Sequence, residues 1–288
     1  MLSLSRYNIF YTSLVCLFSL PLFSTCKTQT VYNAPAGYDF NWPNKFVFSP
    51  ALHEVSGITF IDEKKDFIYA VDDEEGKLFG YNMQTEKISH SKFGKKGDFE
   101  DVSILNNNKI VVLRSDGSLF LFPVNEIEKQ NIDSVKEFNN LLPAGEYEGL
   151  FAAEGKIFVL CKNCAGDKGK SEVSVQSLEM QQNDSLKFIN SFKIDISMTQ
   201  SKEGKQNKFH PSGISKNPVT NDWFIISSTN KLLLVLDEQW KVKQYFPLDP
   251  SIFKQPEGIT FNSKGDLYIS NEGIDGAANI LEFPYNQQ

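Results

Sequence analysis

Residues 256–273 read PEGITFNSKGDLYISNEG. Two short apolar runs, GITF and DLYIS, are separated by turn-forming residues, so this segment predicts a β-hairpin. Comparable runs recur from residue 45 onward: FIYAV (67–71), KLFGYN (77–82), KIVVLR (109–114), SLFLFP (118–123), KIFVLC (156–161), WFIIS (223–227) and KLLLVL (231–236). Apart from a short helical turn expected within 124–140, no long stretch has helical periodicity, and we predict an all-β protein.

The start of this hairpin recurs five times along the chain. Each copy has an acidic or hydroxyl residue, then Gly or Asp, then a branched residue or Leu. The copies are Ser56-Gly57-Ile58, Glu100-Asp101-Val102, Glu148-Gly149-Leu150, Ser212-Gly213-Ile214 and Glu257-Gly258-Ile259, spaced by 44, 48, 64 and 45 residues. A period near 45 with four strands per unit indicates a five-bladed β-propeller of four-stranded antiparallel blades. Two β-sandwiches would also contain many strands, but they would not repeat one start five times.

The ends of the chain fit a closed ring. After Glu257 there is room for three strands, GITF, DLYIS and NILEF. We expect the fourth strand of this last blade to come from the N-terminal segment 45–49, KFVFS, because such pairing removes two exposed sheet edges. The longer interval in the third blade predicts insertions near 163–172 and 197–209.

The N-terminal residues indicate export. Residues 9–23 form an uninterrupted run of 15 residues without charge, IFYTSLVCLFSLPLF. This run suits the apolar part of a signal peptide and is shorter than the roughly 20 residues that span a bilayer. The following Ser24-Thr25-Cys26 resembles a bacterial lipoprotein cleavage box, in which the cysteine becomes the first residue and is lipidated. The alternative is an ordinary signal peptide cut near Thr25, with Cys26 incidental.

These features predict three parts. Residues 1–25 are a lipoprotein signal peptide, residues 26–38 are a flexible polar tether, and residues 39–288 are the β-propeller domain. The expected location is the bacterial cell envelope, where the protein is a membrane-anchored lipoprotein, either periplasmic or surface-exposed. The membrane is thus the first predicted partner, through the lipid at Cys26.

Composition excludes several classes of function. The formal net charge is -7, and the sequence pI is near 5.2, which argues against a nucleic-acid partner because such proteins need a basic stripe. With three histidines in the chain, a metal site built from several histidines is not expected. The common nucleotide-binding, zinc-protease and serine-hydrolase motifs do not occur in the sequence.

Five segments together resemble the SdiA-regulated, YjiK-like family. They are EVSGITF (54–60), DFEDVSIL (98–105), EYEGL (146–150), HPSGIS (210–215) and PEGITFNSKGDLYISNEG (256–273), and the resemblance covers roughly residues 38–288. It implies a five-bladed propeller distantly similar to NHL-repeat propellers, a calcium site, export or membrane association, and no established enzymatic activity. The third blade departs from the family at Cys161-Lys162-Asn163-Cys164 and at the long insertion.

The acidic or hydroxyl residues of the five motifs are the candidate metal ligands. In a propeller the first strand of each blade lines the central channel, so these side chains are expected to form one ring: Glu100, Glu148, Glu257, Ser56 and Ser212. Converging carboxylates cannot all stay ionised without a partner. Calcium fits them better than magnesium, because calcium accepts six to eight oxygens, waters included. Alternatively, the side chains bond backbone groups of neighbouring blades around a water-filled channel.

A second ring, two residues earlier in each motif, is expected at the channel mouth. It is the natural place for a ligand, although a solvated rim is the simpler interpretation. Its members are Glu54, Asp98, Glu146, His210 and Gln255. Turns between the second and third strands of the first and last blades add three further candidate ligands, which we expect to be mainly solvated: Asp73, Glu74 and Glu272.

The cysteines favour a disulfide. Of four cysteines, Cys16 leaves with the signal peptide and Cys26 takes the lipid, so Cys161 and Cys164 remain as a pair in an exported protein. Free thiols are the alternative; a redox site would need a helix N-terminus, and a zinc site would need two more ligands.

Two classes of function follow. The first is a non-enzymatic, calcium-stabilised envelope lipoprotein that binds a small ligand, a glycan or a protein. The second is a calcium-dependent hydrolase of an ester, lactone or phosphoester, with His210, Glu146 or Asp98 as the base. We favour binding, because a second convergent histidine is absent from the motifs, and we assign no catalytic residue.

Overall fold

The computed structural model describes residues 31–61, 64, 66–106, 108–167, 171–197, 209–273 and 276–286. The predicted signal peptide and Cys26 lie outside these residues. The chain divides into Met1–Val31 and Tyr32–Gln288, and the architecture below is that of the second unit. Among the described residues, no helix is both long and apolar enough to cross a membrane.

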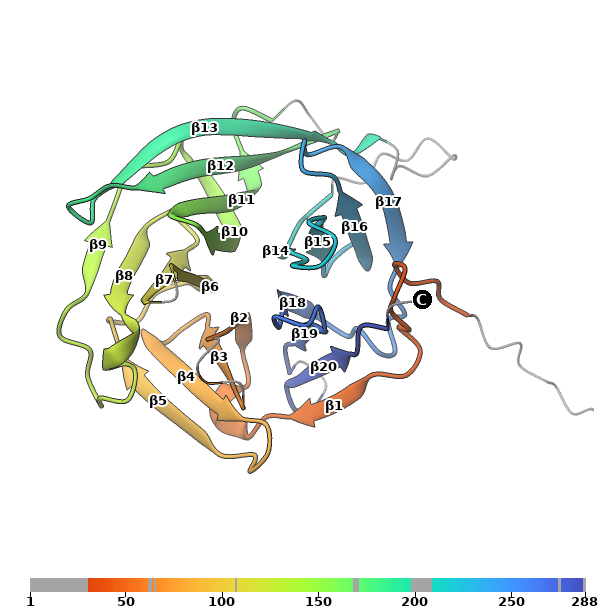
Figure 1. Ribbon diagram of the computed structural model, residues 1–288, viewed down its shortest axis with the longest axis horizontal. Helices are drawn as coiled ribbons and strands as arrows, with labels where there is room; N and C mark the ends of the chain where they lie inside the picture. The colour runs from red at the N-terminus through yellow and green to blue at the C-terminus, as the bar shows by residue number, and fades with distance from the viewer. Residues whose placement is uncertain are drawn as a thin grey trace, which may run out of the picture. The chain divides into compact units, whose positions relative to one another are not determined.

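Five four-stranded antiparallel sheets form a ring of blades (Figure 1). Blade 1 contains β2 (Val55–Phe60), β3 (Phe67–Asp72), β4 (Lys77–Asn82) and β5 (Ile88–Lys92). Blade 2 contains β6 (Phe99–Leu105), β7 (Lys109–Arg114), β8 (Leu119–Pro123) and β9 (Lys136–Phe138). Blade 3 contains β10 (Gly145–Ala153), β11 (Lys156–Cys164), β12 (Glu172–Met180) and β13 (Leu186–Asp195). Blade 4 contains β14 (Gly213–Lys216), β15 (Trp223–Ser227), β16 (Leu232–Leu236) and β17 (Val242–Pro247).

Blade 5 joins the two ends of the ring. It contains β18 (Pro256–Phe261), β19 (Leu267–Asn271) and β20 (Asn279–Phe283), and its outermost strand is β1 (Asn44–Val47). The β1 strand pairs antiparallel with β20, with Asn44 opposite Glu282 and Val47 opposite Asn279. The predicted five-bladed ring, and its closure by an N-terminal strand, are confirmed.

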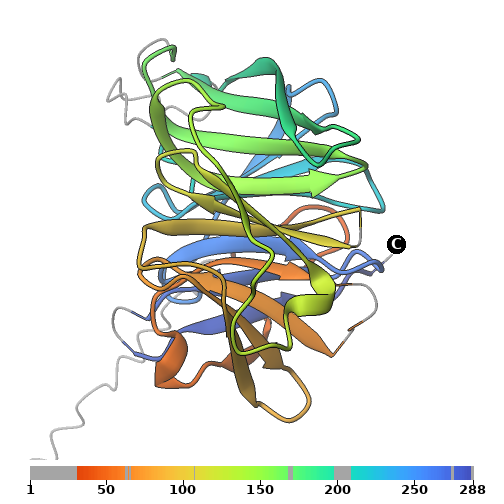
Figure 2. The ribbon, with the colours of Figure 1, turned by 90° about the vertical axis from the view of Figure 1, so that its left-hand side faces the viewer.

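In the described part of the chain, two short 3-10 helices, η1 and η2, lie among the strands. The η1 helix (Pro50–Leu52) connects β1 to β2, and η2 (Val124–Glu126) follows β8 within the region where a helical turn was expected. The segment from η2 to β9 crosses the outer side of the ring that faces the viewer in Figure 2. The Glu126 carboxylate accepts the backbone N–H groups of Asp133 and Ser134, both at 3.2 Å, and so fixes this connection.

Buried apolar side chains gather between neighbouring blades. Among the described residues they form five clusters, one at each blade–blade contact. The cluster between blades 3 and 4 includes Trp223 and Trp240, whose rings stack with centroids 4.4 Å apart. The flat faces of the blades thus bury their apolar residues against each other, and the ring itself supplies the hydrophobic core.

The glycine of the repeated motif has a steric reason. A Cβ atom at Gly213 would lie 2.5 Å from the carbonyl oxygen of Glu257 in the next blade. In blade 2 the motif has Asp101 instead, and its buried carboxylate accepts the backbone N–H groups of Leu150 at 2.6 Å and Val102 at 2.8 Å. The innermost strands therefore pack closely around the channel, and each motif is fitted to its neighbour.

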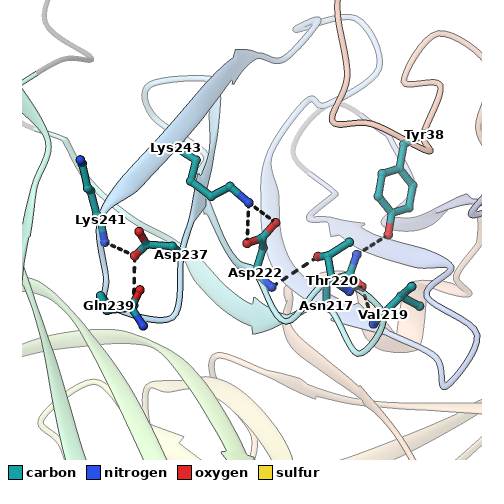
Figure 3. Close-up of polar contacts among 9 residues, drawn as sticks. All are labelled: Tyr38, Asn217, Val219, Thr220, Asp222, Asp237, Gln239, Lys241 and Lys243. Atoms are coloured by element: carbon teal, nitrogen blue, oxygen red, sulfur yellow. Dashed lines mark hydrogen bonds and ion pairs between the residues drawn. The ribbon is translucent and has the colours of Figure 1, made fainter.

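The end of the predicted tether packs on the propeller. The hydroxyl of Tyr38 donates to the carbonyl of Gly265 at 2.6 Å. It also accepts from Asn217 Nδ2 at 2.8 Å (Figure 3). Phe40 is buried among the side chains of blades 4 and 5. Tyr38, at the end of the predicted tether, and Phe40 thus both contact the last two blades.

Candidate functional site

A cavity of about 520 Å³ lies where the innermost strands begin. All five predicted metal-ligand candidates line it: Ser56, Glu100, Glu148, Ser212 and Glu257. They come from five different blades, and segments as far apart as residues 56 and 257 meet here. The structure therefore brings the repeated motif together at one end of the channel.

Irregular strand pairing turns these side chains toward the cavity. In blades 1, 2, 3 and 5 the register between the first and second strands shifts at the motif residue. In blade 4 the pairing begins at Gly213, directly after Ser212. A β-bulge leaves one residue unpaired and redirects its side chain, so the same local device positions four of the five members, whereas Ser212 directly precedes its strand.

Burial raises the pKa of all three glutamates, and repulsion from Glu148 adds to the rise for the other two. Burial, followed by the charge of Glu148, raises the pKa of Glu100 to about 10. The same two causes, in the same order, raise the pKa of Glu257 to about 8. Burial also raises the pKa of Glu148, against the opposing effect of its bond with Lys162. The ring is thus short of positive charge, which is the condition that a bound cation relieves.

The two serines of the ring differ. The hydroxyl of Ser212 donates to the carbonyl of Pro256 at 2.8 Å and accepts the N–H of Ser228 at 3.2 Å, so it ties blade 4 to blade 5. This is the alternative role, bonding between blades, considered for the whole ring. The hydroxyl of Ser56 has no hydrogen-bond partner in the described part of the chain, although the residue is 8% exposed. Ser56 therefore has its whole hydroxyl group available to a ligand, whereas Ser212 retains one acceptor lone pair.

The predicted outer ring is divided. Asp98, His210 and Gln255 line the cavity, whereas Glu54 and Glu146 are exposed beside it. The shifted register at the bulges breaks the simple two-residue alternation that predicted one continuous ring. Glu146 instead lies 3.4 Å from Lys162.

An acidic group lies at the junction of blades 1 and 5. Burial, and then the charge of Glu54, raises the pKa of Asp73 to about 7. Burial and Glu54 also raise the pKa of Glu272, which accepts a hydrogen bond from Gln255. Asp73 and Glu272 line the cavity, and Asp73 Oδ1 is buried without a partner among the described atoms. Glu74, the third turn candidate, is instead exposed and pairs with Lys96 at 3.3 Å.

Lys162 and Lys231 also line the cavity, although the repeated motif did not predict them there. The ammonium of Lys162 binds Glu148, and that of Lys231 donates to the carbonyl of Lys254 at 2.6 Å. Ser228 and Thr229 complete this wall. All four residues lie on or directly after the second strand of a blade, or just before the third, whereas the prediction followed the first strand alone. The sequence did contain a signal for Lys162. This lysine directly follows the predicted strand 156–161, in the same blade as the motif residue Glu148.

The residues present fit a cation, with one restriction. Carboxylates from three blades, the Ser56 hydroxyl and the unpartnered Asp73 Oδ1 supply hard oxygen donors of the type that calcium prefers. However, the three glutamates of the ring do not bring their carboxylate oxygens within 4.8 Å of one another. Among the described residues, a group of three ligand atoms that close occurs at Cys161, Cys164 and Asp167. As the side chains lie, the three glutamates do not all reach one point. A calcium ion here would need water ligands or a turn of at least one carboxylate.

The predicted cysteine pair lies beside the cavity. Cys161 and Cys164 form a disulfide in the structure, with Cα atoms 6.1 Å apart, and Lys162 lies between them in the sequence. The two sulfurs lie near Asp167, but sulfurs bonded to each other are poor metal ligands. The disulfide therefore constrains the end of β11 and does not form a metal site.

A second cavity, of about 260 Å³, lies at the opposite ends of the innermost strands. Its walls are mostly apolar with a few hydroxyls, and they include Ile58, Phe60, Ile259, Phe261 and Thr260. The channel thus has an acidic end and an apolar end. The chemistry suited to a cation is confined to the first.

Comparison with known proteins gives the fold. No family model matches the chain, and no curated protein matches it. Among solved structures, a luciferin-regenerating enzyme is similar with a TM-score of 0.53 at 11% identity, covering 84% of this chain and 95% of that one. A streptogramin B lyase has a TM-score of 0.47 at 10% identity, covering 84% and 97%. A virginiamycin B lyase from Staphylococcus aureus has a TM-score of 0.45 at 13% identity, covering 80% and 67%. The likeness to the first of these structures supports the β-propeller fold, and at 11% identity it assigns no activity.

Proposed function

We propose that this chain is an exported, lipid-anchored β-propeller of the SdiA-regulated, YjiK-like kind that binds a divalent cation, calcium, at the acidic end of its channel. The proposed role of the cation is first structural, since a bound ion would tie at least three blades together. A small ligand, glycan or protein partner would then bind at the same face, in the bacterial envelope.

One observation carries the proposal. Glu100, Glu148 and Glu257 come from three separate blades and line one cavity of about 520 Å³. Burial raises the pKa of each of them, and the charge of Glu148 adds to the rise at Glu100 and at Glu257, so in the absence of a cation the ring holds carboxyls in an unfavourable setting. A divalent ion would favour the ionised form of all three.

The site could also support hydrolysis. His210 and Asp98 line the same cavity as the three glutamates, so a base would lie on the wall of a cation site. A bound cation would supply Lewis-acid activation of an ester, lactone or phosphoester, and the chain would supply the proton acceptor. Binding remains our main proposal, because no second histidine lines the described wall of the cavity.

Metal analysis and calorimetry test the main proposal. The mature protein is purified without added chelator and its metal content is measured, then it is stripped and titrated with calcium and with magnesium. We expect near-stoichiometric binding of calcium, and weaker binding of magnesium, which demands a stricter octahedron. A stripped protein that binds neither ion would contradict the proposal. A panel of esters, lactones and phosphoesters, assayed with and without calcium, tests the hydrolase alternative.

A further inference from the structure

Lys162 provides a positive charge inside the acidic ring. Its ammonium binds Oε1 of Glu148 and lies 3.4 Å from Oε1 of Glu146. The Glu148 side chain is 8% exposed, and the Lys162 side chain is 33% exposed. The lysine thus reaches from the cavity wall to a buried carboxylate and leaves part of its own stem in solvent.

The strand pairing builds this contact on both sides. Between β10 and β11, Glu146 pairs with Asn163, Tyr147 with Cys161, and Gly149 with Leu160. Lys162 and Glu148 are therefore the two residues left unpaired by the irregularities, one on each strand. Two bulges opposite each other direct both side chains to the same place. The Cys161–Cys164 disulfide brackets the bulge that presents Lys162.

This contact engages Oε1 of Glu148, one of the two carboxylate oxygens that the residue could offer to a cation. Glu148 is held by the ammonium, and the three motif glutamates do not converge within 4.8 Å as the described side chains lie. The hydroxyl of Ser56, on the cavity wall and without a partner, remains available, as does buried Asp73 Oδ1. The cavity wall therefore has oxygen donors that the ammonium of Lys162 does not use, and a cation could bind to them.

We propose that the ammonium of Lys162 competes with the cation for Glu148. The cation must displace this ammonium in order to bind, and its affinity is therefore moderate. This inference rests on the proposed function and adds a specificity-determining residue to it. Displacement has a clear path, because the lysine stem is partly exposed and the neighbouring exposed Glu146 can accept the ammonium. The disulfide would keep the lysine in reach in either state.

Calorimetric titration of four variants tests this competition. The mature protein and Lys162→Gln, Lys162→Arg, Lys231→Gln and Lys162→Gln/Glu148→Gln are stripped of metal and titrated with calcium chloride alone. Lys162→Gln should lower the Kd for calcium by roughly tenfold or more, because a unit charge is removed next to the site at an effective dielectric constant of about 20. Lys162→Arg keeps the charge and should not tighten binding. Lys231→Gln is the matched control, since its ammonium bonds a backbone carbonyl on the same cavity wall.

The outcomes separate the two proposals. If the wild type binds calcium and Lys162→Gln binds it no more tightly than Lys231→Gln does, the competition is refuted while the cation site stands. If neither the wild type nor Lys162→Gln binds calcium, both are overturned. Loss of the gain in the double variant would show that the freed group is Glu148. Circular dichroism and melting in chelator establish that each variant is folded before it is titrated.

Discussion

A Cβ atom at Gly258 would lie 2.5 Å from the carbonyl oxygen of Ser56, across the joint between the last blade and the first. The same carbonyl accepts a hydrogen bond from the Ser270 hydroxyl at 3.0 Å, and that hydroxyl also accepts the N–H of Gly258 at 2.8 Å. The joint is thus a compact set of backbone contacts with no room for a side chain. It explains why the motif of the last blade has glycine directly after the ring position Glu257.

Gly258→Ala should destabilise the protein through this joint. The new methyl group would lie too close both to the Ser56 carbonyl and to the Ser270 hydroxyl, at 2.5 and 2.6 Å. Overpacking of this kind costs about 1–3 kcal/mol. Gly94→Ala is the control, because its Cβ would first meet Phe99 at an ordinary 3.8 Å. Urea unfolding of both variants measures the difference. Equal midpoints would mean that the joint relaxes freely.

Calcium should raise the melting temperature. At 100 times the Kd a ligand adds about 2.7 kcal/mol to the free energy of unfolding, which for a domain of this size is a rise of roughly 5–10 °C. Glu148→Gln should remove most of that rise while leaving the fold intact, since amide and carboxylate are nearly isosteric. Differential scanning calorimetry with calcium and with chelator checks both statements. A wild-type melting temperature indifferent to both additions would leave the ring as a hydrogen-bonded channel lining.

Without metal, stability should fall as pH rises from about 5 to about 8. The pKa of Glu257 is about 8 in the folded protein and 4.5 ordinarily, so over this range the unfolded chain binds fewer protons than the folded one. The slope for one such group approaches about 1.4 kcal/mol per pH unit. Glu257→Gln should reduce the slope, and exposed Glu179→Gln should not. Chemical denaturation in chelator, repeated at several pH values, measures it; identical slopes in all three proteins would refute the assignment.

The cysteine pair should be oxidised in the native compartment. Non-reducing digestion and mass spectrometry should yield a peptide containing Cys161 and Cys164 that is lighter by two hydrogen atoms than its reduced form. Because the loop is small, its loss should cost only on the order of 2 kcal/mol, and Cys161→Ser/Cys164→Ser should still fold. Recovery of both cysteines as alkylated thiols, without prior reduction, would show the bond to be absent in the cell envelope.

Cys26→Ala should change where the protein is found. We expect the wild type to begin at Cys26 and to sediment with membranes, since two or more acyl chains give stable anchoring. The variant should be released in soluble form or remain unprocessed. Fractionation with N-terminal sequencing measures this outcome. A variant processed and sedimented like the wild type would favour the ordinary signal peptide.

The fold was predictable because its signal is repeated and steric. Gly213 and Gly258 recur at the same place in their blades since each lies against the next innermost strand, and that requirement is written in the sequence. The convergence of Glu100, Glu148 and Glu257 on one cavity followed from the same alignment. Lys162 could not be placed by that reasoning, because its direction depends on a bulge between β10 and β11. A bulge is a feature of pairing, and a periodic pattern does not reveal it.

Because β1 pairs with β20, the ring can reach its full stability only when the whole chain has been synthesised. Protein synthesis delivers β1 first and its partner last, so the earliest strand must wait while four blades are produced. A chain interrupted after β17 would have neither the partner of β1 nor the neighbour of Ser56, and it would expose two open flanks to proteases. Only a chain that extends through β20 can therefore close the ring. Under the proposed export, the ring would close only after the last residues had crossed the membrane.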